Sequence, residues 1–190
     1  MTQSKVLAAI ICNLMLGISS AFCQNPLVAK TTTGSGNNDL AAYRQNVYDN
    51  PPAPDGYVND YEELFTDVQY AKLDSMIRDF DKQTSIQIAL ISFDTTMSCA
   101  DSLEALSLRM ANAWGVGQKD KNNGIVIGIC SGYGKVKILY GMGLDGVVSD
   151  KETNKIINSD FVPYFEKDEY YTGTVKGLTS LMNLLKARNH

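Results

Sequence analysis

The sequence has little of the chemistry on which most hydrolases depend. Its only histidine is the last residue, His190, which excludes Ser-His-Asp and Cys-His catalysis and histidine-based zinc sites. Neither Cys99 nor Cys130 is followed six residues later by an arginine, so a cysteine-nucleophile phosphatase loop is absent. Hydrolysis by this chain would therefore need a metal-activated water, with an aspartate as the base.

An excess of basic residues is also missing. The chain has 17 Lys and Arg against 21 Asp and Glu, a formal net charge of −4. Neither nucleic acid nor an anionic membrane surface is a natural partner for that balance. Beyond the N-terminal run described next, no segment is apolar enough to span a membrane.

Residues 1–23 have the pattern of a secretory signal peptide. Lys5 precedes an apolar run over 6–22, and small residues lie near its end. Cleavage after Ala21 and cleavage after Cys23 both fit the pattern. We therefore expect an exported protein, periplasmic or secreted. Lipid attachment at Cys23 and an uncleaved N-terminal anchor are the alternatives.

Residues 24–55 are rich in Thr, Gly, Asn and Pro and lack a sustained apolar period. This composition predicts a flexible or extended linker. The folded domain is expected over 56–188. Its patterns predict first a helix over 66–82, opened by a Thr66/Gln69 capping box, and then a strand over 86–93. A second helix should begin at a capping box of Asp101 and Glu104, and strands should follow over 124–130 and 135–140. A helix from Ser149, kinked or split near Pro163, and a last helix through Leu185 complete the order.

This order, α-β-α-β-β-α-α, predicts an α/β fold with a small mixed sheet. The first two strands are joined by a helix and should be parallel neighbours, whereas the tight turn after 124–130 makes the third strand antiparallel to the second. Cys99 and Cys130 should then lie at the same edge of the sheet. Whether they form a disulfide is left open, because Cys is also a common buried residue.

The run Gly141–Gly146 formally matches the G-x-G-x-x-G pattern of dinucleotide-binding turns. We reject that interpretation because the following residues read as helix, without a second parallel strand, and because Asp145 would face the pyrophosphate. No nucleotide cofactor is expected. The glycines instead favour close backbone approach, with carbonyls left free beside Asp145 and Asp150. A plain turn and helix cap is the simpler alternative.

The predicted topology brings the loop 118–124 next to 141–150. It gathers Asp120, Asn123, Asp145 and Asp150 at one edge of the sheet. Oxygen donors of this kind suit a hard cation, Ca²⁺ first and Mg²⁺ second, and any catalytic base would be one of these aspartates. Asp and Asn also populate ordinary turns, and the pattern alone favours that simpler interpretation.

Four successive motifs resemble those of the TPM domain proteins, in register over about 57–185: Val58-Asn59-Asp60, 114–117 (WGVG), 121–124 (KNNG) and 141–150 (GMGLDGVVSD). The resemblance implies a Rossmann-like, three-layer αβα sandwich in an exported protein, with a divalent metal in the acidic loops. In a plant chloroplast-lumen relative it implies acid phosphatase activity linked to repair of a photosynthetic membrane complex. An animal relative modulates a receptor channel, so the fold does not determine the function.

The resemblance adds Asp60 to the metal-site candidates, which become Asp60, Asp120, Asn123, Asp145 and Asp150. Relatives often have Glu where this chain has Asp145, which changes the reach of the carboxylate. The expected function is that of an exported, Ca²⁺-binding module for assembly or maintenance at or near a membrane, with a membrane-protein complex as the partner. The alternative is a weak, metal-dependent acid phosphatase. The sequence leaves the oligomeric state open.

Overall fold

The structure, a computed structural model, describes residues 36–188 of the chain. The helices and strands are, in chain order, α1 (Gly36–Asp49), β1 (Val58–Asp60), α2 (Asp67–Thr84), β2 (Ile88–Ser92), α3 (Leu103–Trp114), β3 (Ile125–Cys130), β4 (Lys135–Tyr140), α4 (Asp150–Ile156), α5 (Val162–Phe165) and α6 (Tyr170–Arg188). From α2 onward the order agrees with the predicted α-β-α-β-β-α-α, and α1 and β1 precede it.

The sheet has four strands in the order β1-β2-β3-β4. Strands β1, β2 and β3 are parallel, with Ser92 opposite both Asp60 and Ile129. Strand β4 runs antiparallel to β3, with Ile125 opposite Tyr140. The predicted parallel pair and the predicted antiparallel hairpin are both confirmed.

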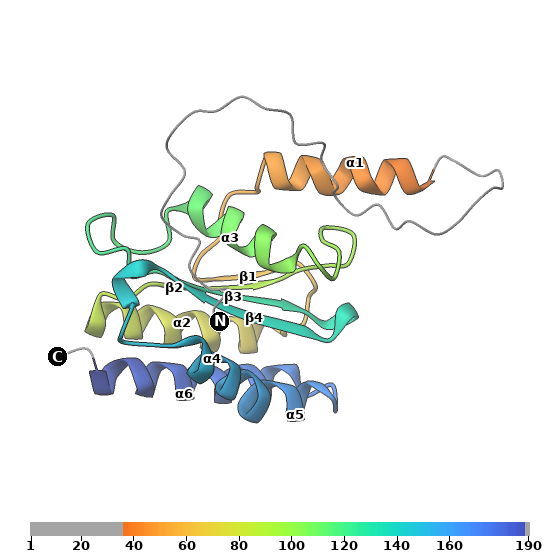
Figure 1. The fold of residues 1–190 in the computed structure, drawn as a ribbon. Helices are drawn as coiled ribbons and strands as arrows, with labels where there is room; N and C mark the ends of the chain where they lie inside the picture. The colour runs from red at the N-terminus through yellow and green to blue at the C-terminus, as the bar shows by residue number, and fades with distance from the viewer. Residues whose placement is uncertain (1–35, 189–190) are drawn as a thin grey trace.

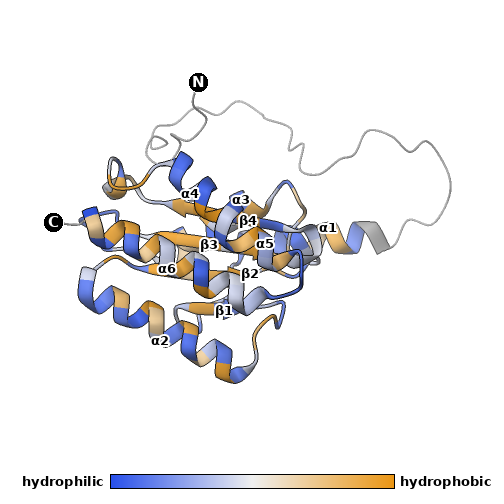
Figure 2. Cartoon of the chain, turned by 90° about the horizontal axis from the view of Figure 1, so that it is seen from below, coloured by the Kyte–Doolittle hydropathy of each residue, from blue (hydrophilic) through white to orange (hydrophobic). Residues whose placement is uncertain are grey.

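Helices cover both faces of the sheet, which makes three layers (Figure 1). Helices α1 and α3 lie on one face, and α2, α4, α5 and α6 lie on the other. Alternate residues of the central strands serve the two cores: Leu90 and Ile127 pack on the side of α2 and α6, whereas Ile91 and Val126 pack on the side of α3. Figure 2 views the molecule from the side that α2 and α6 cover. The α/β sandwich is therefore as expected.

Local hydrogen bonds explain where two helices begin. The Thr66 hydroxyl accepts the Gln69 N–H at 3.4 Å, and the Gln69 side chain accepts the Thr66 N–H at 3.1 Å, so the predicted capping box opens α2. Ser149 and Glu152 open α4 in the same way. The second capping box, at Asp101, is wrong: α3 is preceded by Ser102, which caps no N–H of α3.

Helix α1 lies within residues expected to be a flexible linker. Its sequence lacks an apolar period because only Val47 is buried against the core. Tertiary hydrogen bonds hold it instead: Arg44 Nη2 donates to the Thr95 carbonyl at 2.7 Å, and Arg109 Nη2 donates to the Asp49 carbonyl at 3.0 Å. Such contacts leave no periodic signal in the sequence.

Strand β1 was not predicted either. It has three residues, too few for an alternating pattern to show, and it forms the edge of the sheet beside β2. The predicted split near Pro163 is confirmed, because a π-helical turn at Ile157–Phe161 separates α4 from α5.

The predicted signal peptide, residues 1–23, and the first part of the predicted linker lie outside the described residues. Within 36–188, none of the helices has the combination of length and apolar composition needed to cross a membrane.

Candidate functional site

The loop 118–124 and the loop 141–150 pack backbone against backbone at the start of β3. The Gly141 N–H donates to the Gly124 carbonyl at 2.8 Å, and the Gly143 N–H donates to the Asn122 carbonyl at 3.0 Å. A Cβ on Gly143 would overlap the Lys121 carbonyl oxygen. The predicted juxtaposition of the two loops is thus correct, and the glycines are required by the close approach.

This packing uses carbonyls that we expected to be free. The Gly141 carbonyl accepts the Leu144 N–H at 3.0 Å, and the Asn122 and Gly124 carbonyls accept the two bonds just described. The loop backbone therefore offers fewer oxygen ligands than its glycine content suggests.

Asp150 accepts a hydrogen bond from the hydroxyl of Tyr140, and the charge of Asp145 acts on the same group. The Tyr140 hydroxyl, at the end of β4, donates to Oδ1 of Asp150, at the start of α4, at 2.9 Å. Burial raises the pKa of Tyr140 to about 12, aided by the hydrogen bond to Asp150 and by the charges of Asp150 and Asp145. Asp145 is exposed and Asp150 is half-buried. The charges of two of the predicted carboxylates thus act on the same hydroxyl.

Asn123 is fully engaged in structural hydrogen bonds. Its side chain is buried, its Oδ1 accepts the Gln118 N–H at 2.9 Å, and its Nδ2 donates to the Ser85 carbonyl at 2.7 Å. A cation at Oδ1 would have to displace the bond that shapes the loop. We therefore withdraw Asn123 as a ligand and assign it to holding the loop against the end of α2.

Asp60 does not join the other candidates. It ends β1 at the carboxyl edge of the sheet, opposite Ser92, whereas the two loops lie at the amino end of β3. Its carboxylate accepts the Leu64 and Phe65 N–H groups at 3.1 and 2.9 Å, and also the Ser92 hydroxyl. These bonds explain an aspartate here as the residue that shapes the turn into α2.

Asp120 is exposed at the tip of its loop. Among residues 36–188 there is no group of three or more His, Cys, Asp or Glu side chains arranged to hold a metal ion. Of the five predicted ligands, Asp145 and Asp150 both act on Tyr140.

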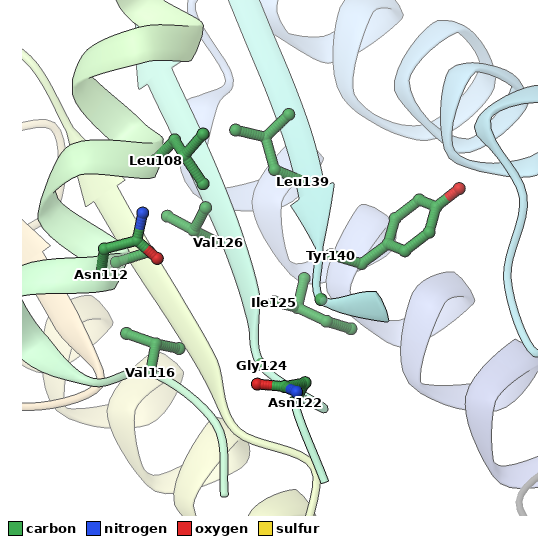
Figure 3. A pocket seen from close by; sticks show the side chains of 11 residues that line it. Leu108, Asn112, Val116, Asn122, Gly124, Ile125, Val126, Leu139 and Tyr140 are labelled. Carbon is green, nitrogen blue, oxygen red and sulfur yellow. The ribbon is translucent and has the colours of Figure 1, made fainter. Parts of the chain in front are cut away.

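A pocket of about 80 Å³ lies next to the paired loops, between α3 and the ends of β3 and β4. Leu108 of α3 and Leu139 of β4 point toward one another across it, and Tyr140 points away (Figure 3). Asn112 and Asn122 supply its polar groups. The sequence does not predict this pocket, because Leu108 and Leu139 follow only the ordinary apolar periodicity of core residues.

A larger and more open hollow, of about 750 Å³, lies beside β1. Asp55, Asp60, Glu63 and Asp67 line it, together with the aromatic rings of Tyr61, Phe65 and Tyr70. Burial, and then the charge of Asp55, raise the pKa of both tyrosines. Asp60 is thus part of an acidic surface at some distance in the fold from Asp145.

The two cysteines lie on the same side of the sheet, as predicted. Tyr133 lies three residues after Cys130 and donates to the Ser98 carbonyl at 3.3 Å, next to Cys99. Cys130 is a free, buried thiol, so the two cysteines are not bonded to each other. Burial raises the pKa of Cys130 to about 11, which makes it a poor nucleophile.

The chain matches one protein-family model and several solved structures. A family model described as "TPM domain" matches residues 58–184. No curated protein matches the chain. Among solved structures, the N-terminal domain of a protein from P. gingivalis has a TM-score of 0.64 at 24% identity, covering 76% of this chain and 90% of that one.

Two further solution structures are similar. The BA42 protein from the psychrophilic bacterium Bizionia argentinensis has a TM-score of 0.57 at 20% identity, covering 67% of this chain and 86% of its own. The N-terminal domain of cg2496 from Corynebacterium glutamicum has a TM-score of 0.50 at 13% identity, covering 74% and 84%. At such identities these structures bear on the fold alone.

Proposed function

Because the chain belongs to the TPM domain family, we propose that it is an exported binding module whose paired loops, 118–124 and 141–150, take up Ca²⁺ beside a partner at or near a membrane. Metal uptake is assigned to Asp145 and Asp150, with Asp120 on the neighbouring loop. Asp60 and Asn123 are not part of this assignment.

The observation that carries the proposal is the hydrogen bond from Tyr140 to Asp150, at a hydroxyl on which the charge of Asp145 also acts. The charges of both carboxylates raise the pKa of this hydroxyl, so a cation at that place would relieve their mutual repulsion. Carboxylates with water suit Ca²⁺, which tolerates irregular coordination. Two carboxylates on exposed loops support weak binding, on the order of 10⁻⁴ to 10⁻³ M, as in extracellular modules.

Bound Ca²⁺ would supply charge neutralisation and loop ordering rather than catalysis. The side chains of this chain would do the remaining work: Asp150 keeps its bond to Tyr140, and Asn123 keeps the facing loop in place. The loops border the pocket between Leu108 and Leu139, so their order affects that surface.

The phosphatase alternative has no observation of its own in its favour. A metal-dependent hydrolase needs a nucleophile or metal-activated water with a positioned base. Cys130 is buried with a raised pKa, and no side chain in the described part of the chain is identified as a base positioned beside a nucleophile. Phosphomonoester turnover by the purified chain, with and without chelator, is the direct assay. We expect none above that of the Asp150→Ala variant.

Titration calorimetry with CaCl₂ tests the proposal. We expect saturable heat and a rise in melting temperature at millimolar Ca²⁺, both weakened in Asp145→Asn and Asp150→Asn. Asp79→Asn is the matched control, because the Asp79 carboxylate lies on α2, outside both loops, and its side chain is 60% exposed. Absence of heat and of any thermal shift would reject the cation site.

A further inference from the structure

Strand β4 is an edge strand with one row of backbone groups turned away from the sheet. The Gly141 N–H bonds to the Gly124 carbonyl directly opposite, so this is a hydrogen-bonded pair of the β3–β4 ladder. Bonded and non-bonded pairs alternate in an antiparallel ladder, so the N–H and C=O groups of Val136, Ile138 and Tyr140 point outward. No residue in the described part of the chain hydrogen-bonds to these groups.

The side chains of β4 on the α3 face change from cationic to apolar along the strand. Lys135 and Lys137 are 40% and 45% exposed, and Leu139 lies beside the pocket. Lys137 pairs with Glu104 at 3.0 Å, and Lys135 donates to the Ala100 carbonyl at 2.9 Å and lies 3.7 Å from Asp101. Exposed pairs of this kind contribute little to stability, so the lysines are available to another carboxylate.

The pocket next to Leu139 can take one apolar side chain. It is bounded by Leu108 and Asn112 of α3 and by Val126 of β3, and it has a volume of about 80 Å³ (Figure 3). A long side chain on a strand added beside β4 can reach over Leu139 into it, because side chains on neighbouring strands meet across the ladder.

We propose that β4 binds an extended segment of a partner protein as an added strand, antiparallel to β4, with a long apolar residue opposite Leu139 and acidic residues opposite Lys137 and Lys135. The partner therefore carries an apolar residue at one position and carboxylates two and four positions later. Main-chain hydrogen bonds would supply affinity, and the pocket and lysines would supply specificity. The inference rests on the proposed function in one respect, that the domain is a binding module.

Other occupants fit this edge less well. A second copy of β4 would offer no carboxylate to Lys135 and Lys137, and edge lysines discourage pairing between like strands. The other edge of the sheet is closed, because the Val58 carbonyl accepts the Tyr70 hydroxyl at 2.8 Å. Strand β4 is therefore the edge at which a strand can be added.

The test uses the purified chain and a capped synthetic peptide, Thr-Leu-Thr-Glu-Thr-Glu-Thr. We expect saturable binding that weakens with added salt, and slower hydrogen exchange at the amides of Val136, Ile138 and Tyr140. Replacing the peptide leucine with serine should weaken binding about tenfold or more. A scrambled peptide of the same composition should bind no better than the serine peptide.

Protein variants locate the surface. Lys137→Ala should weaken binding by about two- to fivefold, whereas Lys151→Ala, an exposed lysine on α4, should leave it unchanged. Leu108→Trp should fill the pocket and abolish the advantage of the leucine peptide. Should that variant fail to fold, the comparison of leucine and serine peptides on the unaltered chain decides the same point.

Three results would overturn the inference: no peptide binding at millimolar concentration, equal binding of the serine peptide, or protection of amides outside β4. Measuring binding in CaCl₂ and in EGTA separates it from the cation site. Peptide binding without Ca²⁺ uptake rejects the cation site alone, and Ca²⁺ uptake without peptide binding rejects this inference alone.

Discussion

Glu62 ties the turn after β3 to the end of β1: its Oε2 accepts the backbone N–H of Ser131 at 2.9 Å, across 69 residues of sequence. Its Oε1 also accepts the Ser131 hydroxyl at 2.9 Å and the Gly132 N–H at 3.3 Å. Ligands of open α/β sheets bind at the carboxyl ends of the strands. In this chain a carboxylate of the protein itself occupies the backbone donors at that edge.

Replacing Glu62 should therefore both destabilise the fold and open an anion site. We expect Glu62→Ala to lower the free energy of unfolding by about 1–2 kcal/mol, because it leaves the Ser131 and Gly132 donors without their charged acceptor. Sulfate should then raise the melting temperature of Glu62→Ala more than that of the unaltered chain.

Glu166→Ala is the control for the Glu62 prediction, since Glu166 is an exposed glutamate just after α5. Denaturant unfolding measures the first effect and thermal unfolding in sulfate the second. Equal stabilities of Glu62→Ala and Glu166→Ala would show that the bonds across β1 and β3 contribute nothing.

The sequence allowed the elements to be predicted where the information was local. Thr66 and Gln69 are three residues apart, and their side chains cap each other as such a pattern predicts. The order of β2, β3 and β4 followed from the connections between them, and it placed the 118–124 and 141–150 loops correctly.

The sequence could not show which of the predicted metal ligands are free to bind, because ligand chemistry depends on the hydrogen bonds that the side chains already make. Asn123 has the right oxygen, yet its amide donates to Ser85, 38 residues earlier. Asp60 has the right charge, yet it accepts N–H groups of its own turn at the far edge. Residue type shows which atoms are present and does not show which are already used.

Gly143 tests how tightly the two loops are coupled. A Cβ at this position would overlap the Lys121 carbonyl oxygen, which belongs to backbone and cannot rotate away. We expect Gly143→Ala to cost about 2 kcal/mol or more of stability, and to abolish Ca²⁺ uptake by separating the loops.

Gly146→Ala provides the comparison for Gly143→Ala. Gly146 has φ of 83°, but a Cβ there would meet nothing within 4 Å. Gly146→Ala should lower the free energy of unfolding by backbone strain alone, about 1–2 kcal/mol. The NMR amide signals of the 118–124 loop should stay unchanged. Equal spectral changes in that loop for both variants would contradict the steric account.

Arg188 controls the acid titration of Glu152. The hydrogen bonds from Arg188 and then from Ser149 lower the pKa of Glu152 to about 2 from its ordinary 4.5. Because the folded pKa is depressed, the stabilisation is present above pH 4.5 and is lost as pH falls through about 2. Arg188→Gln should raise the pKa of Glu152 toward 4.5, measured by NMR titration of its side-chain carboxyl.

Lys186→Gln is the control for the Arg188 prediction. Lys186 lies near the same end of α6, but it donates to Gln83 at 2.8 Å and makes no bond to Glu152. It should leave the pKa of Glu152 where it is. An unchanged Glu152 titration in Arg188→Gln would show that the ion pair does not persist in solution.

Tyr140 reports on the two carboxylates of the proposed cation site. Burial, then the bond to Asp150, and then the charges of Asp150 and Asp145 raise its pKa to about 12 from 10.0. Because the folded pKa is raised, its stabilising contribution is present below pH 10.0 and is lost as pH rises through about 12.

Asp145→Asn and Asp150→Asn should each lower the Tyr140 pKa, while burial keeps the value above 10.0. Asp150→Asn should lower it by more, because it also changes the hydrogen-bonded partner. NMR titration of the ring carbon bearing the hydroxyl, assigned with Tyr140→Phe, measures this, and Asp79→Asn should leave it unchanged. If neither loop variant moved the Tyr140 pKa, the two carboxylates would not act on this hydroxyl in solution, and the place assigned to Ca²⁺ would have no basis.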